Sequence, residues 1–402
     1  MNTFTSSRKK PHNLTFKYSL HQLAYYCAST AIFAFCTIFL LEHNFSASQA
    51  GIIMAAGNWG ACLLQPVLGD IADRGKRPLL IPLTFILVMI NVVSLFSILT
   101  FPLPKIVFGG LYLLCALSFN SIGSLANAIT IYYSERNWPI SLGIGRGVGF
   151  FAYAAGSLVF GYVILWIGID QTIWIGFALL VILALLTLTF PTLSQEEHLS
   201  VVPKGKTTDS ISLLQFFKTY KVFSASLIGV IFLGMFHVMI ESYFIAIFER
   251  LGGNSSNVGA ALAVAAFSAV PITFCIDKIR EKVTSAWMLR ISGIAYILKA
   301  VLLFFAPNII SVYLIQLLQT VTYAFLAPGQ IFYAAECTEA KDMVKGQTIS
   351  SSAYSLGCAL GYLAGGLLID YFGVVTMLIS GIVITTIGTI ILFITVKPKK
   401  RA

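Results

Sequence analysis

The sequence predicts an all-α membrane protein with twelve transmembrane helices in two pseudo-symmetric six-helix bundles. Three observations support this: the composition, the spacing of apolar stretches and an internal repeat. Of the 402 residues, 57% are hydrophobic and 10% are charged, whereas a soluble domain carries about 25% charged residues. A soluble core could not bury this much apolar surface, so the solvent around most of the chain is lipid.

Apolar stretches of about 20 residues follow one another along the whole chain. Each is long enough to cross a hydrocarbon core of about 30 Å as a helix. Glycine and proline inside them are compatible with helices, because neighbouring helices satisfy the freed backbone groups. The first stretch is too long for a signal peptide and lacks a small-residue cleavage site, so we expect it to be retained. The predicted helices cover residues 18–41, 48–69, 79–100, 106–132, 140–167, 172–190, 222–248, 256–276, 286–306, 309–335, 346–369 and 374–396.

Basic residues lie almost entirely on one face of this arrangement. Of the 26 Lys and Arg residues, only Lys105 and Arg250 fall on the opposite face, and Arg146 and Lys299 lie within helices. An excess of cationic loops marks the cytoplasmic side of a membrane. We therefore predict a multi-pass plasma-membrane protein with both termini in the cytoplasm. The net charge of +10 is explained in this way, and we expect no nucleic-acid partner.

An internal repeat divides the chain into six helices plus six. The longest polar stretch, residues 192–212, falls at the division. We predict an N-terminal bundle over residues 1–191, a cytoplasmic central loop over 192–212 and a C-terminal bundle over 213–402. Parallel halves of this kind are a transporter architecture. Three glycine pairs are 205 residues apart: Gly156 and Gly361, Gly161 and Gly366, and Gly168 and Gly373. Two further pairs are 208 residues apart: Gly51 and Gly259, and the charged Asp73-Arg74 and Glu281-Lys282.

A cationic loop between the second and third stretches carries a motif. Residues 69–78 read Gly-Asp-Ile-Ala-Asp-Arg-Gly-Lys-Arg-Pro. The string resembles the Gly-x-x-x-Asp-Arg-x-Gly-Arg-Arg loop of the major facilitator superfamily, with one spacer missing. The resemblance implies that this loop bridges to the eleventh helix and holds the outward-open state. The matching conformational-switch residues are Gly69, Asp73, Arg74, Gly75, Lys76 and Arg77.

Three further stretches resemble the branch that contains lactose permease and other oligosaccharide–proton symporters. They are Phe45-Ser-Ala-Ser-Gln-Ala-Gly51, Gly57-Asn-Trp-Gly with Gln65-Pro66, and Val344-Lys-Gly-Gln with Gly365-Gly-Leu-Leu-Ile-Asp370. The helix-5 arginine of that branch has no clean counterpart, because the alignment on Val148-Gly149-Phe150 places Gly143 at its position. The resemblance implies alternating access, helices 1, 4, 7 and 10 lining the cavity, and a small-molecule substrate moving with a proton or another cation.

Charged residues inside predicted helices are the first candidates for function, because each is costly to keep in a membrane. Arg146 is the seventh residue of the fifth predicted helix, roughly 9 Å from its cytoplasmic end, and we expect it to bind substrate. Its alternative role is a structural ion pair. His237 and Glu241 are four residues apart and share a helix face, which predicts a proton-coupling site. The alternative is that Glu241 only pairs with Lys299. Glu336, near the inner end of the tenth helix, is the next coupling candidate.

Polar residues at helical spacing follow the predicted cavity helices. Amides, hydroxyls and aromatic faces suit a ligand rich in hydroxyl groups, although each side chain could instead make a hydrogen bond between helices. The expected substrate-binding residues besides Arg146 are Tyr25, Asn58, Asn120, Asn127, Gln319, Tyr323 and Gln330.

The pattern favours a proton-coupled importer of a sugar or small oligosaccharide. The alternative is a proton antiporter that exports amphipathic compounds, which would need an acid in the first bundle; the first and fourth predicted helices carry none before Glu135. No phosphate-binding Gly-x-x-x-x-Gly-Lys-Ser/Thr motif and no metal-ligand spacing are present. We therefore expect no enzyme activity, no cofactor and no metal, and a monomer embedded in the lipid bilayer.

Overall fold

The computed structural model describes residues 13–74, 79–134, 138, 140–191, 212–339 and 342–397, and every regular element in them is a helix. Ten of these helices are long and apolar enough to span a membrane, or eleven if the bent first pair counts as one span. That count takes α16 (Met343–Thr395) as one helix of 53 residues, although its backbone is non-helical at Gly373. Such a helix would be about 80 Å long, much longer than one membrane crossing. Dividing it at Gly373 raises the count from eleven candidate spans to twelve.

The first half contains the elements up to residue 188. Its first span bends by 44° between Ala34 and Cys36, because a π-helical turn inserts there. The other spans of this half are single helices. The elements are α1 (Leu14–Ser29), η1 (Thr30–Ala34), α2 (Cys36–Glu42), α3 (Ala47–Arg74), α4 (Leu80–Thr100), α5 (Lys105–Ser134), α6 (Leu142–Ile167) and α7 (Ile169–Leu188).

The second half follows the same plan after a short entry helix, and two of its spans are broken. Asparagine capping boxes at Asn254 and Asn308 start α12 and α14, and Thr284 caps α13, satisfying N–H groups that a helix start leaves unpaired. The remaining elements are α9 (Leu213–Thr219), α10 (Lys221–Ser242), α11 (Phe244–Arg250), α12 (Ser255–Lys282), α13 (Ser285–Phe304), α14 (Ile309–Gln316), η2 (Leu317–Thr320) and α15 (Tyr323–Cys337).

The internal repeat is visible in the backbone. Phe35 interrupts the first span with φ −114° and ψ 22°, and Tyr243, 208 residues later, interrupts the seventh with φ −113° and ψ 23°. Gly168 and Gly373, 205 residues apart, share a positive φ of 91° and 80°, a conformation that glycine adopts without steric cost. Both α3 and α12 have 28 residues. The halves therefore repeat in conformation as well as in sequence.

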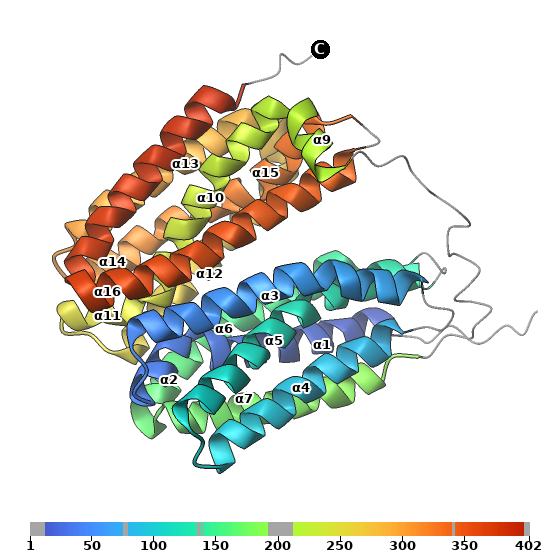
Figure 1. Cartoon of the computed structure of the whole chain (residues 1–402), viewed down its shortest axis with the longest axis vertical. Helices are drawn as coiled ribbons and strands as arrows, with labels where there is room; N and C mark the ends of the chain where they lie inside the picture. The colour runs from blue at the N-terminus through green and yellow to red at the C-terminus, as the bar shows by residue number, and fades with distance from the viewer. Residues whose placement is uncertain are drawn as a thin grey trace, which may run out of the picture.

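The two halves form two bundles that meet along α3 with α16 and α6 with α12 (Figure 1). At Gly51, a methyl group would overlap the carbonyl oxygen of Tyr362 in α16. At Gly259, a methyl group would overlap the carbonyl oxygen of Ser157 in α6. Gly51 and Gly259 are repeat-related, so the same close helix approach occurs twice at this interface.

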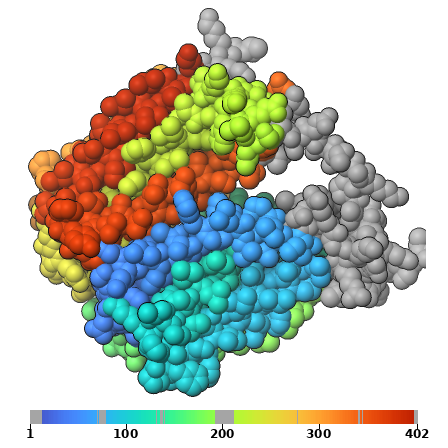
Figure 2. All heavy atoms as spheres, in the orientation of Figure 1, coloured from blue at the N-terminus to red at the C-terminus, as the bar shows by residue number. Residues whose placement is uncertain are grey.

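Hydrogen bonds between the halves all lie at one end of the molecule, as far as the described residues go. Thr37 Oγ1 donates to the Ser242 carbonyl at 2.7 Å, and the Tyr243 hydroxyl donates to the Ala47 carbonyl at 3.2 Å. The surface is hollowed between the halves toward the other end (Figure 2). That open end is the one that the charge distribution predicts to be cytoplasmic. The structure is thus closed at the predicted outer end.

Candidate functional site

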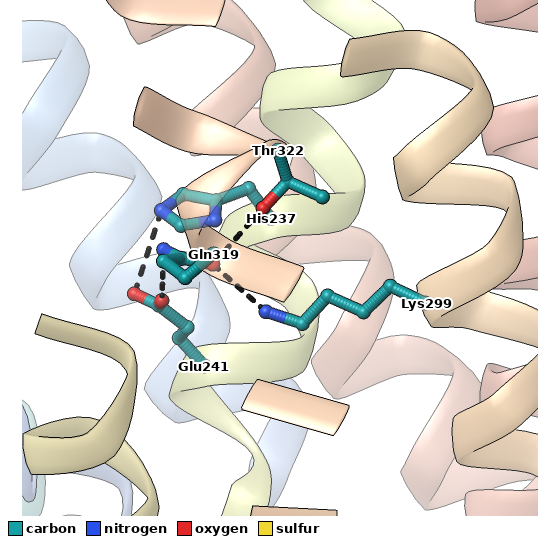
Figure 3. A network of polar contacts seen from close by, with 5 residues as sticks. All are labelled: His237, Glu241, Lys299, Gln319 and Thr322. Atoms are coloured by element: carbon teal, nitrogen blue, oxygen red, sulfur yellow. Dashed lines mark hydrogen bonds and ion pairs between the residues drawn. The ribbon is translucent and has the colours of Figure 1, made fainter. Parts of the chain in front are cut away.

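A chain of polar contacts lies inside the second bundle and joins three spans (Figure 3). His237 and Glu241 come from α10, one helical turn apart, with Nε2 and Oε2 separated by 3.5 Å. The Gln319 amide nitrogen donates to Glu241 Oε1 at 3.2 Å, and Lys299 Nζ of α13 donates to Gln319 Oε1 at 2.9 Å. Thr322 Oγ1 also donates to Gln319 Oε1, at 3.2 Å.

A break in the tenth span brings Gln319 to this position. The helix tightens into the 3₁₀ turn η2 and restarts at Tyr323, which frees backbone groups from the regular helical ladder. At the restart, the Thr322 carbonyl accepts from the Leu326 N–H at 3.0 Å and also from Ser292 Oγ at 2.8 Å. Irregular backbone at membrane depth is stable when protein groups satisfy it in this way.

The orientation of the Gln319 amide follows from its neighbours. An ammonium group only donates hydrogen bonds, and Lys299 is 2% exposed. Gln319 must therefore present Oε1 to Lys299 and its NH₂ group to Glu241. Glu241 and Lys299 are consequently bridged by an amide, whereas the structural alternative predicted from the sequence had them paired directly.

Aromatic rings pack against the network at His237. The His237 and Tyr323 rings are stacked, 5.1 Å apart with an interplanar angle of 8°, and Tyr354 contacts both rings. Tyr153 of α6 interacts electrostatically with Glu241 from the opposite half. The Glu241 side chain remains 23% exposed. A carboxyl group in this position can exchange protons with water and contact a ligand between the halves.

Arg146 lies on the other side of the interface, on α6. This helix begins at Leu142, so Arg146 is about 6 Å from its start and nearer the open end than the sequence predicted. The side chain is exposed and makes no hydrogen bond or ion pair with any described residue. It interacts electrostatically with Tyr18 and Tyr26 of α1 and with Tyr323 of α15. Tyr323 is therefore close to both Arg146 and the His237–Glu241 pair.

Most other predicted binding residues hydrogen-bond within or between helices. The Tyr25 ring stacks on Phe119 at 4.6 Å. Asn58 and Asn120 each donate to the carbonyl four residues earlier, of Met54 and Ala116. Gln330 accepts from Ser350 Oγ at 3.2 Å. For the Asn127 side chain the structure gives no hydrogen bond. These residues are not joined to the His237–Glu241 network.

The remaining predicted residues lie toward the open end. Glu336 accepts a hydrogen bond from Ser285 Oγ. Gly69 lies in α3 with open space around it. Asp73 and Arg74 are the last turn of that helix, but their side chains lie outside the described part of the chain, as do Gly75, Lys76 and Arg77.

Sequence reasoning missed three contributors. Thr322 donates a hydrogen bond within the network, and the Tyr354 ring contacts His237. At the closed end, Asp370 accepts a hydrogen bond from the backbone of α3 in the opposite half. The spacing of Gln319, Thr322 and Tyr323 on one helix face was a usable signal for Thr322. No cluster of His, Cys, Asp and Glu that could hold a metal lies among the described residues.

Comparisons with known proteins show the family and the fold of the chain. The sequence model described as "MFS_1 like family" matches residues 15–380, whereas a search of curated proteins finds no match. The nucleoside transporter NupG superposes with a TM-score of 0.79 at 16% identity, covering 96% of this chain and 98% of that one. A bacterial homolog of the human lysosomal transporter Spinster, inward-facing and occupied, gives a TM-score of 0.71 at 15% identity, with 95% and 96% covered. A POT family transporter in complex with 5-aminolevulinic acid gives 0.64 at 14% identity, with 94% of both chains covered. At these identities the solved structures show the shared fold.

Proposed function

The chain belongs to the MFS_1 like family, a family of membrane transporters, and we propose from this premise that it imports a sugar or small oligosaccharide together with a proton. The observation that carries the proposal is the chain of contacts from His237 through Glu241 and Gln319 to Lys299. A carboxyl group within a membrane-spanning bundle is a functional site by default.

Proton binding at Glu241 changes the network in a defined way. Ionised Glu241 accepts from the Gln319 amide and faces His237. A protonated Glu241 becomes a donor as well, so it turns toward an acceptor, and hydroxyl oxygens of a bound sugar are suitable acceptors. Protonation and sugar binding thus favour each other, which is the requirement for symport.

The two bundles supply the conformational cycle. Glycine contacts close the outer end, and the opposite end is hollowed. Rocking of one bundle against the other around a fixed central site exposes that site to each side in turn. The predicted switch loop at residues 69–77 would then stabilise the state that is open to the outside.

A nucleoside is the second candidate cargo. The parallel rings of His237 and Tyr323, 5.1 Å apart, offer a flat surface suited to a base, and the fold is shared with the nucleoside transporter NupG.

Counterflow with the purified protein in proteoliposomes tests the proposal. Vesicles loaded with unlabelled sugar should accumulate labelled sugar, and an inward proton gradient should drive uptake against a concentration gradient. Exchange of nucleosides but of no sugar would favour the second candidate. Uptake driven equally well without a proton gradient would contradict proton coupling.

A further inference from the structure

The charges around the interface between the bundles do not balance. Among the described residues, the network of Figure 3 and the neighbouring Arg146 together contain two cations, Arg146 and Lys299, and one acid, Glu241. Lys299 is satisfied inside its bundle by Gln319. Arg146 has no hydrogen-bonding or ion-pair partner among the described residues, and a guanidinium group cannot lose its proton.

Close packing of α6 against α1 fixes the backbone on both sides of Arg146. Tyr18 lies against Gly145 and Tyr26 against Gly149, where a methyl group on either glycine would overlap the ring. These two rings flank Arg146 on the α1 side. On the other side, Tyr323 of the second bundle is close enough for an electrostatic interaction. The exposed Arg146 side chain is therefore near both α1 and the second bundle.

The opposite wall of that space carries the proton site. Tyr323 interacts electrostatically with Glu241 as well as with Arg146, so the cation and the acid are both near the same ring. When Glu241 takes up a proton, the one acid of this described set is neutralised and its net charge rises from +1 to +2. An anionic cargo would return the loaded site to the net charge of +1 that it has without the proton.

We infer that the transported sugar carries a carboxylate, as hexuronic acids do, and that Arg146 binds this group. This inference rests on the proposed sugar–proton symport and narrows its substrate class. A planar guanidinium group binds a carboxylate through two parallel hydrogen bonds. The sugar hydroxyl groups then face His237 and Glu241. One proton moves with one anion, so the transport cycle carries no net charge.

Matched sugars test the inference in proteoliposomes. D-Glucuronate and D-glucose share a ring and differ in a carboxylate at the sixth carbon. Labelled D-glucuronate and D-galacturonate should exchange about tenfold or more better than D-glucose and D-galactose, as expected for a charged hydrogen-bonded pair. Arg146→Gln should remove that preference, and Arg146→Lys should retain only part of it.

Arg250→Gln is the control variant, because Arg250 is exposed at the predicted outer end of α11. It should leave the preference unchanged. Current recorded on a solid-supported membrane gives a second readout: uptake of the uronate with a proton should produce no current.

The outcomes separate the two proposals. Exchange of neutral sugars at least as fast as uronates, unchanged by Arg146→Gln, would overturn the inference and leave sugar symport intact. A proton-driven inward current with a neutral sugar, without uronate exchange, would also overturn the inference and leave sugar symport intact. Exchange of neither sugar class would overturn both.

Discussion

Asp370, near the outer end of the first arm of α16, accepts a hydrogen bond of 2.7 Å from the backbone N–H of Ser48 in the opposite half. Its other carboxylate oxygen accepts from the N–H of Ala47 at 3.1 Å. These N–H groups belong to the first turn of α3, where a helix leaves its donors unpaired and favours negative charge. The carboxylate therefore caps a helix of the other bundle, and separation of the halves at the predicted outer end would break this contact.

Asp370→Ala should favour the state that is open to the outside. Loss of a helix cap costs about 1 kcal/mol, which corresponds to about a fivefold change in the ratio of the two states. Spin labels at Ile106 and Ile310, which are exposed at the outer ends of α5 and α14, would report the distance between the halves. The longer-distance population should increase. Asp170→Ala is the control, since Asp170 pairs with His43 within one half; an equal response there would contradict the assignment.

Gly259→Val should prevent tight closure of the outer end. Even a methyl group at this position would overlap the Ser157 carbonyl oxygen, and backbone cannot move aside as a flexible side chain can. We expect the same label pair to show a mostly open outer end and uptake to fall about tenfold or more. Gly110→Ala should change neither measurement, because nothing lies within 4 Å of that position. Normal uptake by Gly259→Val would show that the helices separate more easily than the contact indicates.

Glu241→Gln should abolish proton-driven accumulation and retain exchange without a gradient. The amide resembles the protonated carboxyl group, so the carrier can cycle with cargo bound but cannot release a proton. The exchange rate should also lose its dependence on pH. Accumulation in the double variant Glu241→Gln with Lys299→Met would indicate that Glu241 only balances the charge of Lys299. In that case Glu336 becomes the candidate for the proton site.

Gln319→Leu should lower stability as well as coupling. The change leaves the buried Lys299 ammonium without its acceptor, and an unsatisfied buried charged group costs about 3 kcal/mol. The unfolding temperature of the detergent-solubilised protein should decrease, and Gln319→Leu with Lys299→Met should recover most of it. Gln215→Leu on the exposed surface of α9 should leave the temperature unchanged. A stable single variant would mean that Lys299 finds another acceptor.

Much of the fold follows from the sequence because hydropathy and repeat spacing act over whole helices. The 208-residue offset of Gly51 and Gly259 already indicated the relation later found between α3 and α12. The site is harder to predict. The break at η2 turns Gln319 toward both Glu241 and Lys299, and hydropathy does not report such a break. Asn58 and Asn120 donate hydrogen bonds within their own helices. Their helical spacing is the same as that expected for amides facing a cavity, so spacing alone does not separate the two cases.

The matching interruptions at Phe35 and Tyr243 have an evolutionary consequence. A bend shared by both halves, with nearly identical backbone angles, is what duplication of an ancestral half would leave in both copies. The charged groups show no such inheritance, because at the 208- and 205-residue offsets Glu241 corresponds to Phe33, Lys299 to Ser94 and Arg146 to Ser351. The bend thus follows the internal repeat, whereas the charged residues of the site do not. Gly51→Ala and Gly259→Ala should have interchangeable effects, whereas a substitution at Glu241 has no equivalent in the other half.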